Sequence, residues 1–264
     1  MEPRPRHLGP DYAAQFAEDS VAEAYAFRPV YPPPVFDRLL ELAVDRNHPI
    51  LDLGCGTGDI AAGLFERGYP CVHGVDPSDS MLRIARSRLA EPGESLLWIR
   101  AAAENFVPTT EYALVVAAES LHWMDWEQVL PKIASWLSRG SFLALVTGRR
   151  FRNLPWQAGL ESLLGEFSTN REYHNYDLVE ELATRGLYRE VGSERASGGV
   201  VRQSIEEYVE SFHSRNGFSR DRMTQGRARD FDAALRSLVL PFSTAGFISG
   251  EVTATLVWGV PGAG

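Results

Sequence analysis

The chain has 264 residues, of which 44% are hydrophobic and 23% are charged, and its formal net charge is −9. This composition is ordinary for a globular protein, and the length is sufficient for one sizeable α/β domain with a cap, with two domains as the alternative. The acidic balance argues against binding of nucleic acid or of a membrane surface, because both favour a basic protein. We therefore expect a small-molecule or protein substrate.

Cysteine usage and the N-terminal segment bear on the location of the protein. Cys55 and Cys71 show neither metal-ligand spacing nor a disulfide framework, so we interpret both as reduced packing residues and predict no metal site. Residues 1–12 lack the apolar stretch of a signal peptide, and no later run approaches the length of a membrane span. We expect a cytoplasmic monomer or homodimer.

Residues 12–44 predict a helix, a proline-rich hinge and a second helix. The hinge reads FRPVYPPP, and its prolines hold an extended backbone. Pro34 fits the first turn of the following helix, where its missing N–H costs nothing. The hinge should therefore present Arg28 and Tyr31 rigidly.

A glycine-rich turn follows the first predicted strand. Residues 50–59 read ILDLGCGTGD, and Gly54, Gly56 and Gly58 allow a tight turn with no Cβ between the backbone and a ligand. A dinucleotide fingerprint has the spacing G-x-G-x-x-G, whereas this turn has G-x-G-x-G. Asp52 precedes the turn, where it would be unfavourable beside a pyrophosphate and favourable beside an ammonium group. We predict a cationic or zwitterionic ligand.

The second predicted strand, 71–76, ends on Asp76. In folds of this kind a carboxylate at this position binds a ribose, because its two oxygens match vicinal hydroxyl groups. Pro77 and Ser78 also have the features of a helix start, with which a capping role for Asp76 is compatible. The ligand is predicted to contain a ribose.

Strands and helices alternate through the middle of the chain. Predicted strands lie near 50–54, 71–76, 95–101, 113–118 and 141–147, and predicted helices near 58–67, 79–89 and 126–138. This alternation predicts a parallel sheet with helices on both faces and a ligand at the carboxyl ends of the strands. Later elements are strands near 188–195 and 248–260 and helices near 205–215 and 222–238.

Three segments, LDLGCGTGDIA at 51–61, GVDPSDSML at 74–82 and AAAENFVP at 101–108, together resemble the motifs of class I S-adenosylmethionine-dependent methyltransferases of the small-molecule type. The resemblance extends from about residue 12 to 258. It implies a Rossmann-like α/β fold, with a seven-stranded, mostly parallel sheet, helices on both faces and an antiparallel end hairpin. It also implies one domain over 1–264, whose parts are a core (45–150 and 186–260) and a helical cap (10–44, 151–180 and 203–240).

The resemblance assigns the cofactor, S-adenosyl-L-methionine, to the predicted site. In related enzymes an R-P-x-Y-P stretch folds over the cofactor, which implies that Arg28 reaches the cofactor carboxylate; a surface arginine is the alternative. Asp52 is expected to bind the cofactor amino group, or else to stabilise the turn. Asp76 is expected to bind the ribose.

The third motif departs from the family at the adenine position. Relatives commonly carry a polar or acidic side chain where this chain has Ala102. Adenine recognition is therefore expected to depend on backbone amides around Ala103, with Glu104 either contributing or lying exposed in a loop. Glu119, after the fourth strand, is expected at the same edge of the sheet.

The stretch 117–126, AAESLHWMDW, follows the fourth strand, where the transferable methyl group is expected. It resembles trans-aconitate-type methyltransferases, in which an indole N–H can hold the acceptor carboxylate, so Trp123 is predicted as a substrate contact. His122 is predicted as a base toward a hydroxyl or amine, or as a donor toward a carboxylate. The alternative is that both residues pack at the strand–helix corner and do not contact the substrate.

We therefore favour an oxygen acceptor, carboxylate ahead of hydroxyl, because a carboxylate is already ionised and needs only alignment. A nitrogen or carbon acceptor, or a cofactor-binding protein without catalysis, is the alternative. The predicted cap contains aromatic side chains that build either an acceptor pocket or a core, namely Trp156, Tyr173, His174, Tyr176, Phe212 and Phe218. Arg149, Arg150 and Arg152, after the fifth strand, are interpreted as a solvated basic cluster, with anion contacts at the carboxyl edge of the sheet as the alternative.

Overall fold

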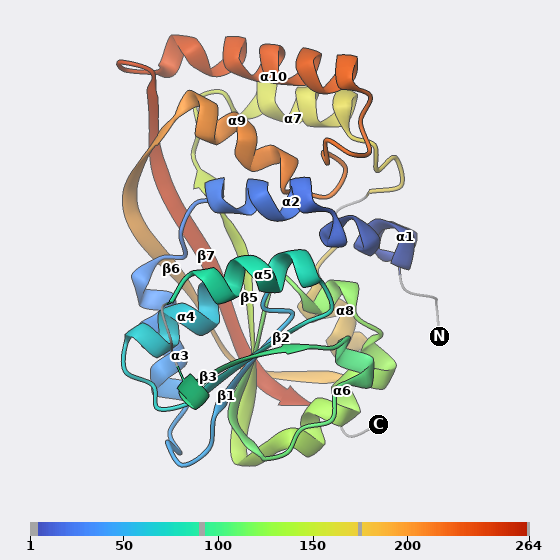
Figure 1. Cartoon of the computed structure of the whole chain (residues 1–264), viewed down its shortest axis with the longest axis vertical. Helices are drawn as coiled ribbons and strands as arrows, with labels where there is room; N and C mark the ends of the chain where they lie inside the picture. The colour runs from blue at the N-terminus through green and yellow to red at the C-terminus, as the bar shows by residue number, and fades with distance from the viewer. Residues whose placement is uncertain (1–4, 90–92, 174–175, 263–264) are drawn as a thin grey trace.

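The computed structural model describes residues 5–89, 93–173 and 176–262, so His174 of the predicted cap lies outside the described residues. Its centre is a seven-stranded sheet in the order β3-β2-β1-β4-β5-β7-β6 (Figure 1). The strands are β1 (Ile50–Leu53), β2 (Val72–Asp76), β3 (Leu96–Arg100), β4 (Tyr112–Ala118), β5 (Leu137–Arg152), β6 (Tyr188–Ser204) and β7 (Phe247–Pro261). Strands β1 to β5 pair in parallel, whereas β7 pairs antiparallel with β5 and β6. The predicted α/β fold with its antiparallel end hairpin is confirmed.

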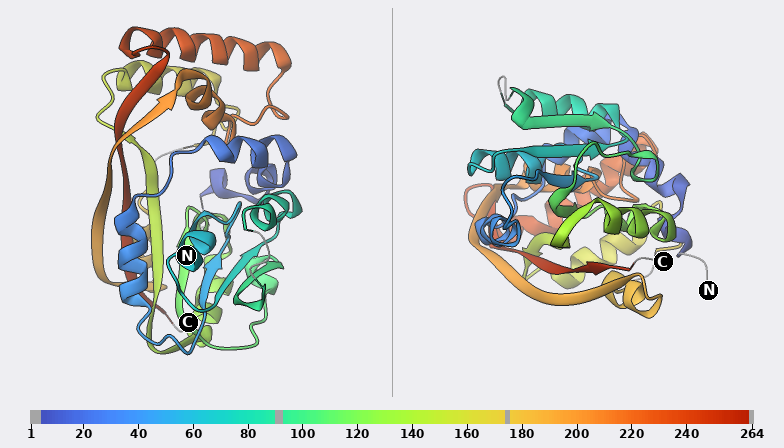
Figure 2. Two further views of the ribbon diagram at one scale, coloured as in Figure 1. Left: turned by 60° about the vertical axis from the view of Figure 1, so that its left-hand side comes forward. Right: turned by 90° about the horizontal axis from the view of Figure 1, so that it is seen from below.

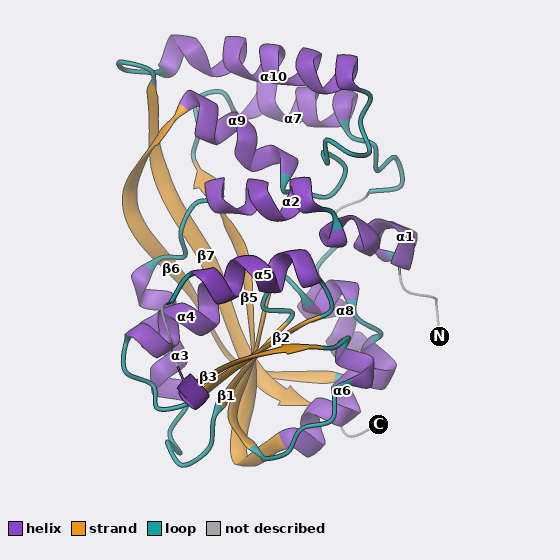
Figure 3. Cartoon of the chain, in the orientation of Figure 1, coloured by secondary structure: helices purple, strands orange, loops and turns teal. Residues whose placement is uncertain are grey.

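Helices surround this sheet (Figure 3). They are α1 (Pro10–Ala13), α2 (Asp19–Ala24), α3 (Pro33–Leu42), α4 (Asp59–Glu66), α5 (Asp79–Ser87), α6 (Trp126–Trp136), α7 (Gln157–Phe167), α8 (Leu178–Thr184), α9 (Ile205–His213) and α10 (Gln225–Val239). No helix within the described ranges is both long enough and apolar enough to cross a bilayer.

Two apolar layers cover the sheet. One buries α6 and α8 against the strands, through residues such as Ile133 and Leu182. The other buries α4 together with α3, whose Val35 and Leu39 are fully buried there. The expected cap range 10–44 thus includes a helix that packs on the sheet, because the apolar positions of α3 recur at helical spacing on one face.

Strands β5, β6 and β7 are longer than predicted and extend beyond the sheet core toward α7, α9 and α10 (Figure 2). A separate apolar core fills that upper part, with Val252 of β7 packed among the helices. The second half of β6 was not predicted, because the glycine pair Gly198 and Gly199 has the features of a turn that ends a strand. In the structure they lie at a register shift between Ser197 and Val200, where a bulge allows pairing to continue.

The N-terminal part of the cap lies between the later cap helices and the sheet core. Helix α2 packs between α5 of the core and α9 of the cap (Figure 1). Val21 and Ala22 of α2 are fully buried against Met81 of α5. The carboxyl ends of the parallel strands therefore face a lid made of the N-terminal segment.

Candidate functional site

A cavity of about 1070 Å³ lies at the carboxyl ends of β1, β2 and β4. The N-terminal segment forms its opposite wall, through residues including Phe16, Tyr25 and Tyr31. This volume is at the upper end of the range for small-molecule sites, which is about 300–1,000 Å³. The cavity is therefore large enough for a nucleoside-sized ligand and a second small molecule.

The glycine turn has three residues with positive φ, namely Gly54 (+74°), Gly56 (+54°) and Gly58 (+82°). A Cβ on Gly54 would lie 2.5 Å from Cβ of Ser120, and one on Gly58 would lie 2.4 Å from Cη2 of Trp98. Gly54 and Gly56 line the cavity. Gly58 is not among the described residues that line the cavity, and the absence of a side chain at this position makes room for the indole of Trp98. A cofactor contact of Gly58 stays a prediction.

Asp52 is buried at the base of the cavity, with 1% of its surface exposed. Its Oδ2 accepts a hydrogen bond from the Ala61 amide at 3.0 Å, so it also stabilises the first turn of α4. Within the described residues, Oδ1 of Asp52 and Oγ1 of Thr57, which also lines the cavity, are buried without a hydrogen-bond partner. A buried polar atom without a partner is costly. A ligand with an ammonium group and a carboxylate would satisfy both atoms.

Burial raises the pKa of Asp52 from 3.8 to about 8, against the opposing effect of the Ala61 amide. The folded protein therefore binds one more proton than the unfolded chain between about pH 4 and pH 8, and its stability should fall as pH rises through that window. We expect the free energy of unfolding of the wild type, measured with urea, to decrease as pH rises from about 4 to 8. Relative to Asp52→Asn, the decrease should be up to about 1.4 kcal/mol per pH unit.

Asp79→Asn is the control, since the Asp79 side chain is 68% exposed. This variant should keep the wild-type pH dependence. Parallel pH curves for the wild type and Asp52→Asn would contradict the elevated pKa.

Asp76 is held by both the glycine turn and the start of α5. Its Oδ2 accepts from the Gly56 amide at 2.9 Å, and its Oδ1 accepts from the Ser78 amide at 2.8 Å. Burial raises the pKa of this carboxyl group, while the two amides lower it. Each oxygen keeps a further lone pair for a ligand hydroxyl. Ser78 caps α5 by accepting from the Met81 amide, so the expected helix start is confirmed.

Arg28, which belongs to the N-terminal segment, lines the cavity. Its guanidinium carbon lies 4.0 Å from the centre of the Tyr25 ring. Tyr25 Cε1 in turn lies 4.0 Å from the position that a Cβ on Gly56 would occupy. The structure thus brings Arg28 to the wall of the cavity, contrary to the alternative of a solvated surface arginine.

Ala103 and Glu104 line the cavity at a short 3-10 helix after β3. Oε1 of Glu104 accepts from the Asp125 amide at 2.8 Å, and the Glu104 carbonyl accepts from Lys132. Glu104 therefore joins this segment to the start of α6 and is not an exposed loop residue. Phe106 packs in the core, with its ring 5.3 Å from that of Trp136.

Glu119 adopts a positive φ of 53° directly after β4, which is uncommon for a residue other than glycine. Its Oε1 accepts from the amides of Gly148 at 2.5 Å and Arg149 at 3.3 Å, so it connects the end of β4 to the register shift within β5. Glu119 lines the cavity. Backbone strain of this kind is frequent in binding sites.

The structure separates the two predicted catalytic residues. Trp123 lines the cavity and packs against Phe16, with ring centres 5.2 Å apart. His122 is not among the described lining residues, although its ring lies 4.8 Å from that of Trp123. Both residues lie on the 3-10 helix Leu121–Trp123, and a contact of either one with the substrate stays a prediction.

Sequence reasoning missed a buried charge cluster beside the turn. The side chain of Arg149 is 4% exposed, so it is not part of a solvated cluster. It lies 2.5 Å from Oδ2 of Asp59 and stacks 4.2 Å from the ring centre of Tyr31. Burial would raise the pKa of Asp59, but Arg149 and Arg88 bring it below its usual value. Asp59 and Arg149 are far apart in sequence, so no local pattern predicts their pairing.

Comparison with known proteins agrees with this geometry. Residues 50–140 match a family model described as a methyltransferase domain. An uncharacterized methyltransferase of Mycobacterium tuberculosis is 35% identical over 138 residues, which cover 52% of this chain and 54% of that protein. Trans-aconitate 2-methyltransferase of Escherichia coli is 33% identical over 115 residues, which cover 42% and 44%. The chain thus spans about half the length of the curated relatives it matches.

A solved structure of a putative type II methyltransferase from Anaeromyxobacter dehalogenans has the same fold, with a TM-score of 0.64 at 23% identity over 89% of this chain and 97% of that one. Fold and cavity together define a Rossmann-like protein with a cavity at the carboxyl ends of its strands, where ligands bind in folds of this kind. Residues 50–140 are therefore similar to a methyltransferase domain, and the matched relatives are described as methyltransferases.

Proposed function

We propose that this protein transfers a methyl group from S-adenosylmethionine to a small-molecule acceptor. The observation that carries the proposal is the pair of buried atoms without partners, Oδ1 of Asp52 and Oγ1 of Thr57, which line the same cavity as Asp76. S-adenosylmethionine has an ammonium group, a carboxylate and a ribose, so its functional groups match these side chains.

Each lining residue then has a role that its chemistry allows. Asp52 accepts a hydrogen bond from the cofactor ammonium group, which favours the ionised carboxylate. Thr57 and Arg28 donate to the cofactor carboxylate, and Asp76 accepts from the ribose hydroxyls. Ala103 and Glu104 flank the adenine. The cofactor itself supplies a methyl group on a positively charged sulfur.

An oxygen acceptor is our preferred substrate, with carboxylate ahead of hydroxyl. A carboxylate is ionised at neutral pH, so the protein needs only to align oxygen, methyl and sulfur and to exclude water. Trp123 in the cavity wall offers a rigid apolar surface with one directional donor. The named E. coli relative acts on trans-aconitate, which supports a carboxylate. A nitrogen or carbon acceptor, or binding without catalysis, is the alternative.

Turnover separates these alternatives. The purified protein is titrated calorimetrically with S-adenosylmethionine and with a nicotinamide dinucleotide, and methyl transfer is then measured with panels of carboxylic acids, phenols and amines. We expect saturable binding of S-adenosylmethionine only, and turnover with a carboxylic acid. Failure to bind S-adenosylmethionine would overturn the proposal, and binding without turnover of any acceptor would favour the non-catalytic alternative.

The neighbouring pair at the 3-10 helix provides a matched test of the substrate wall. We expect Trp123→Phe to raise KM for the acceptor about tenfold, because Trp123 lines the cavity and its indole N–H is the donor that we propose for the acceptor. We expect His122→Ala to leave KM and kcat within about twofold, since His122 is not among the described lining residues. Steady-state kinetics with the best acceptor would measure both. A larger rise in KM for His122→Ala than for Trp123→Phe would indicate that His122 is the residue that contacts the substrate.

A further inference from the structure

Neutral groups of the cap hold Arg28 at the cavity wall. Its Nε donates to Oγ of Ser214 at 2.7 Å, and its Nη2 donates to the Ser214 carbonyl at 2.6 Å. No carboxylate pairs with Arg28 among the residues that the structure describes, whereas Arg149 in the same wall is paired with Asp59. The contacts of Arg28 thus orient its guanidinium without neutralising it, and its charge stays available to an anionic group of a ligand.

Ser214 is suited to this contact by its place at the end of α9. It is fully buried and is the C-terminal capping residue of that helix. Its hydroxyl donates to the Ser211 carbonyl at 2.5 Å, which leaves the oxygen lone pairs to accept from Arg28. Carbonyl groups at a helix C-terminus lack intrahelical partners, and the helix dipole favours a cation beside them.

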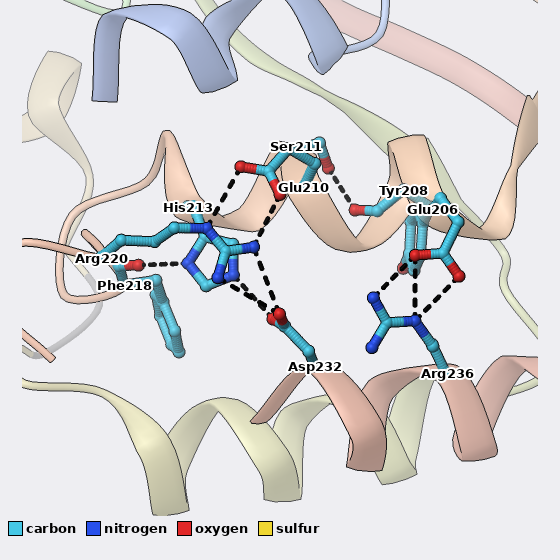
Figure 4. A network of polar contacts seen from close by, with 9 residues as sticks. All are labelled: Glu206, Tyr208, Glu210, Ser211, His213, Phe218, Arg220, Asp232 and Arg236. Carbon is cyan, nitrogen blue, oxygen red and sulfur yellow. Dashed lines mark hydrogen bonds and ion pairs between the residues drawn. The ribbon is translucent and has the colours of Figure 1, made fainter. Parts of the chain in front are cut away.

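The preceding residue fixes the end of α9 (Figure 4). Nδ1 of His213 donates to the Phe218 carbonyl at 2.7 Å, and its Nε2 lies 2.7 Å from Oδ1 of Asp232 on α10. Arg220 bridges the other oxygen of Asp232 to Glu210 of α9. These contacts join the end of α9, the segment that follows it and α10. The position of Ser214 is therefore fixed by a network within the cap.

The cap also holds the backbone next to Arg28. Nε2 of Gln203 on β6 donates to the Phe27 carbonyl at 2.6 Å. Two separate elements, β6 and the end of α9, therefore form hydrogen bonds with the adjacent hinge residues Phe27 and Arg28. A change at either element would shift the guanidinium relative to the glycine turn.

We propose that Ser214 is a positioning residue for the carboxylate end of the bound cofactor, acting through Arg28. The inference rests on the proposed function. According to this proposal, the end of α9 contributes to cofactor binding, and its contribution affects only the amino-acid portion of the ligand. The nucleoside portion contacts Asp76 and the segment after β3 and is independent of Ser214.

Two ligands that differ in the amino-acid portion test this selectivity. S-adenosylhomocysteine has the carboxylate, and 5′-methylthioadenosine lacks the whole amino-acid group. We expect Ser214→Ala to weaken S-adenosylhomocysteine about tenfold in calorimetry, because one hydrogen bond to a charged group is lost. Binding of 5′-methylthioadenosine should change by less than about twofold.

Ser211→Ala is the matched control, because Ser211 is an equally buried serine of α9 whose hydroxyl donates to the Tyr208 carbonyl. It should leave both affinities within about twofold of wild type. In an Arg28→Ala background, Ser214→Ala should cause no further loss of S-adenosylhomocysteine binding, since residues that act as one unit are not additive.

The outcomes separate the two proposals. Equal loss of both ligands in Ser214→Ala, or a full tenfold loss in the Arg28→Ala background, would overturn the positioning role and leave the proposed function standing. Wild-type protein that binds neither ligand would overturn the proposed function and this inference with it.

Discussion

Asp76→Ala is expected to weaken binding of S-adenosylhomocysteine by about 100-fold, the largest loss of affinity from any single side chain of the cavity. The carboxylate would provide acceptors for two ribose hydroxyls, and water would solvate those hydroxyls poorly inside the cavity. The substitution also leaves the amides of Gly56 and Ser78 without their acceptor, so the turn itself loses support. Calorimetric titration measures the loss directly.

Asp79→Ala controls for the removal of a carboxylate near the site. Asp79 lies three residues later on α5, with its side chain 68% exposed and 3.9 Å from Arg100. Its substitution should leave the affinity within about twofold, because exposed pairs contribute little. Thermal unfolding of both variants would show that folded protein was titrated. A loss below about threefold for Asp76→Ala would contradict a ribose contact.

Gly58→Ala is expected to destabilise the protein by about 3 kcal/mol, the largest loss of stability among our predictions. Two effects add at this position. Gly58 has a φ of +82°, and its new Cβ would lie 2.4 Å from the indole of Trp98. Trp98 packs against the apolar layer of α3 and α4, so the ring can move only by disturbing that layer. Urea unfolding measures the change.

Gly68→Ala separates these effects, because Gly68 has a φ of +83° and no atom lies within 4 Å of the position that its new Cβ would occupy. We expect a cost of about 1 kcal/mol there, from backbone strain alone. Equal costs for the two variants would show that the Trp98 contact relaxes freely. Because Gly58 is not among the described lining residues, the folded Gly58→Ala protein should bind S-adenosylhomocysteine within about threefold of wild type.

The nature of each signal explains which site residues could be predicted. Gly54, Gly56 and Asp76 lie at the ends of adjacent parallel strands, so strand order alone brings them to one edge of the sheet. Gly58 belongs to the same motif, but the space that its missing side chain leaves is filled by Trp98 of β3, and the sequence of the turn does not reveal this contact. His122 and Trp123 are neighbours in sequence, and only the turn of the backbone decides which of them reaches the cavity.

The cap shows the same division on a larger scale. Trp156, Phe212 and Phe218 have the composition of either a ligand pocket or a core, and the structure packs all three into the apolar core of the cap. Composition could not distinguish these alternatives, because both bury aromatic rings. The pairing of Arg28 with Ser214 joins residues 186 positions apart, for which a single sequence holds no local signal.

By itself, the sequence determined the alternation of strands and helices in the α/β fold, the glycine turn and the acidic residue that ends β2. Alternating periodicity and turn chemistry are local properties, which act within about one element of the chain. Only the tertiary structure decided that Arg149 is buried against Asp59, that Trp123 and not His122 lines the cavity, and that Ser214 holds Arg28. Those outcomes depend on contacts between distant segments, where close packing allows one side chain to occupy a space and excludes another.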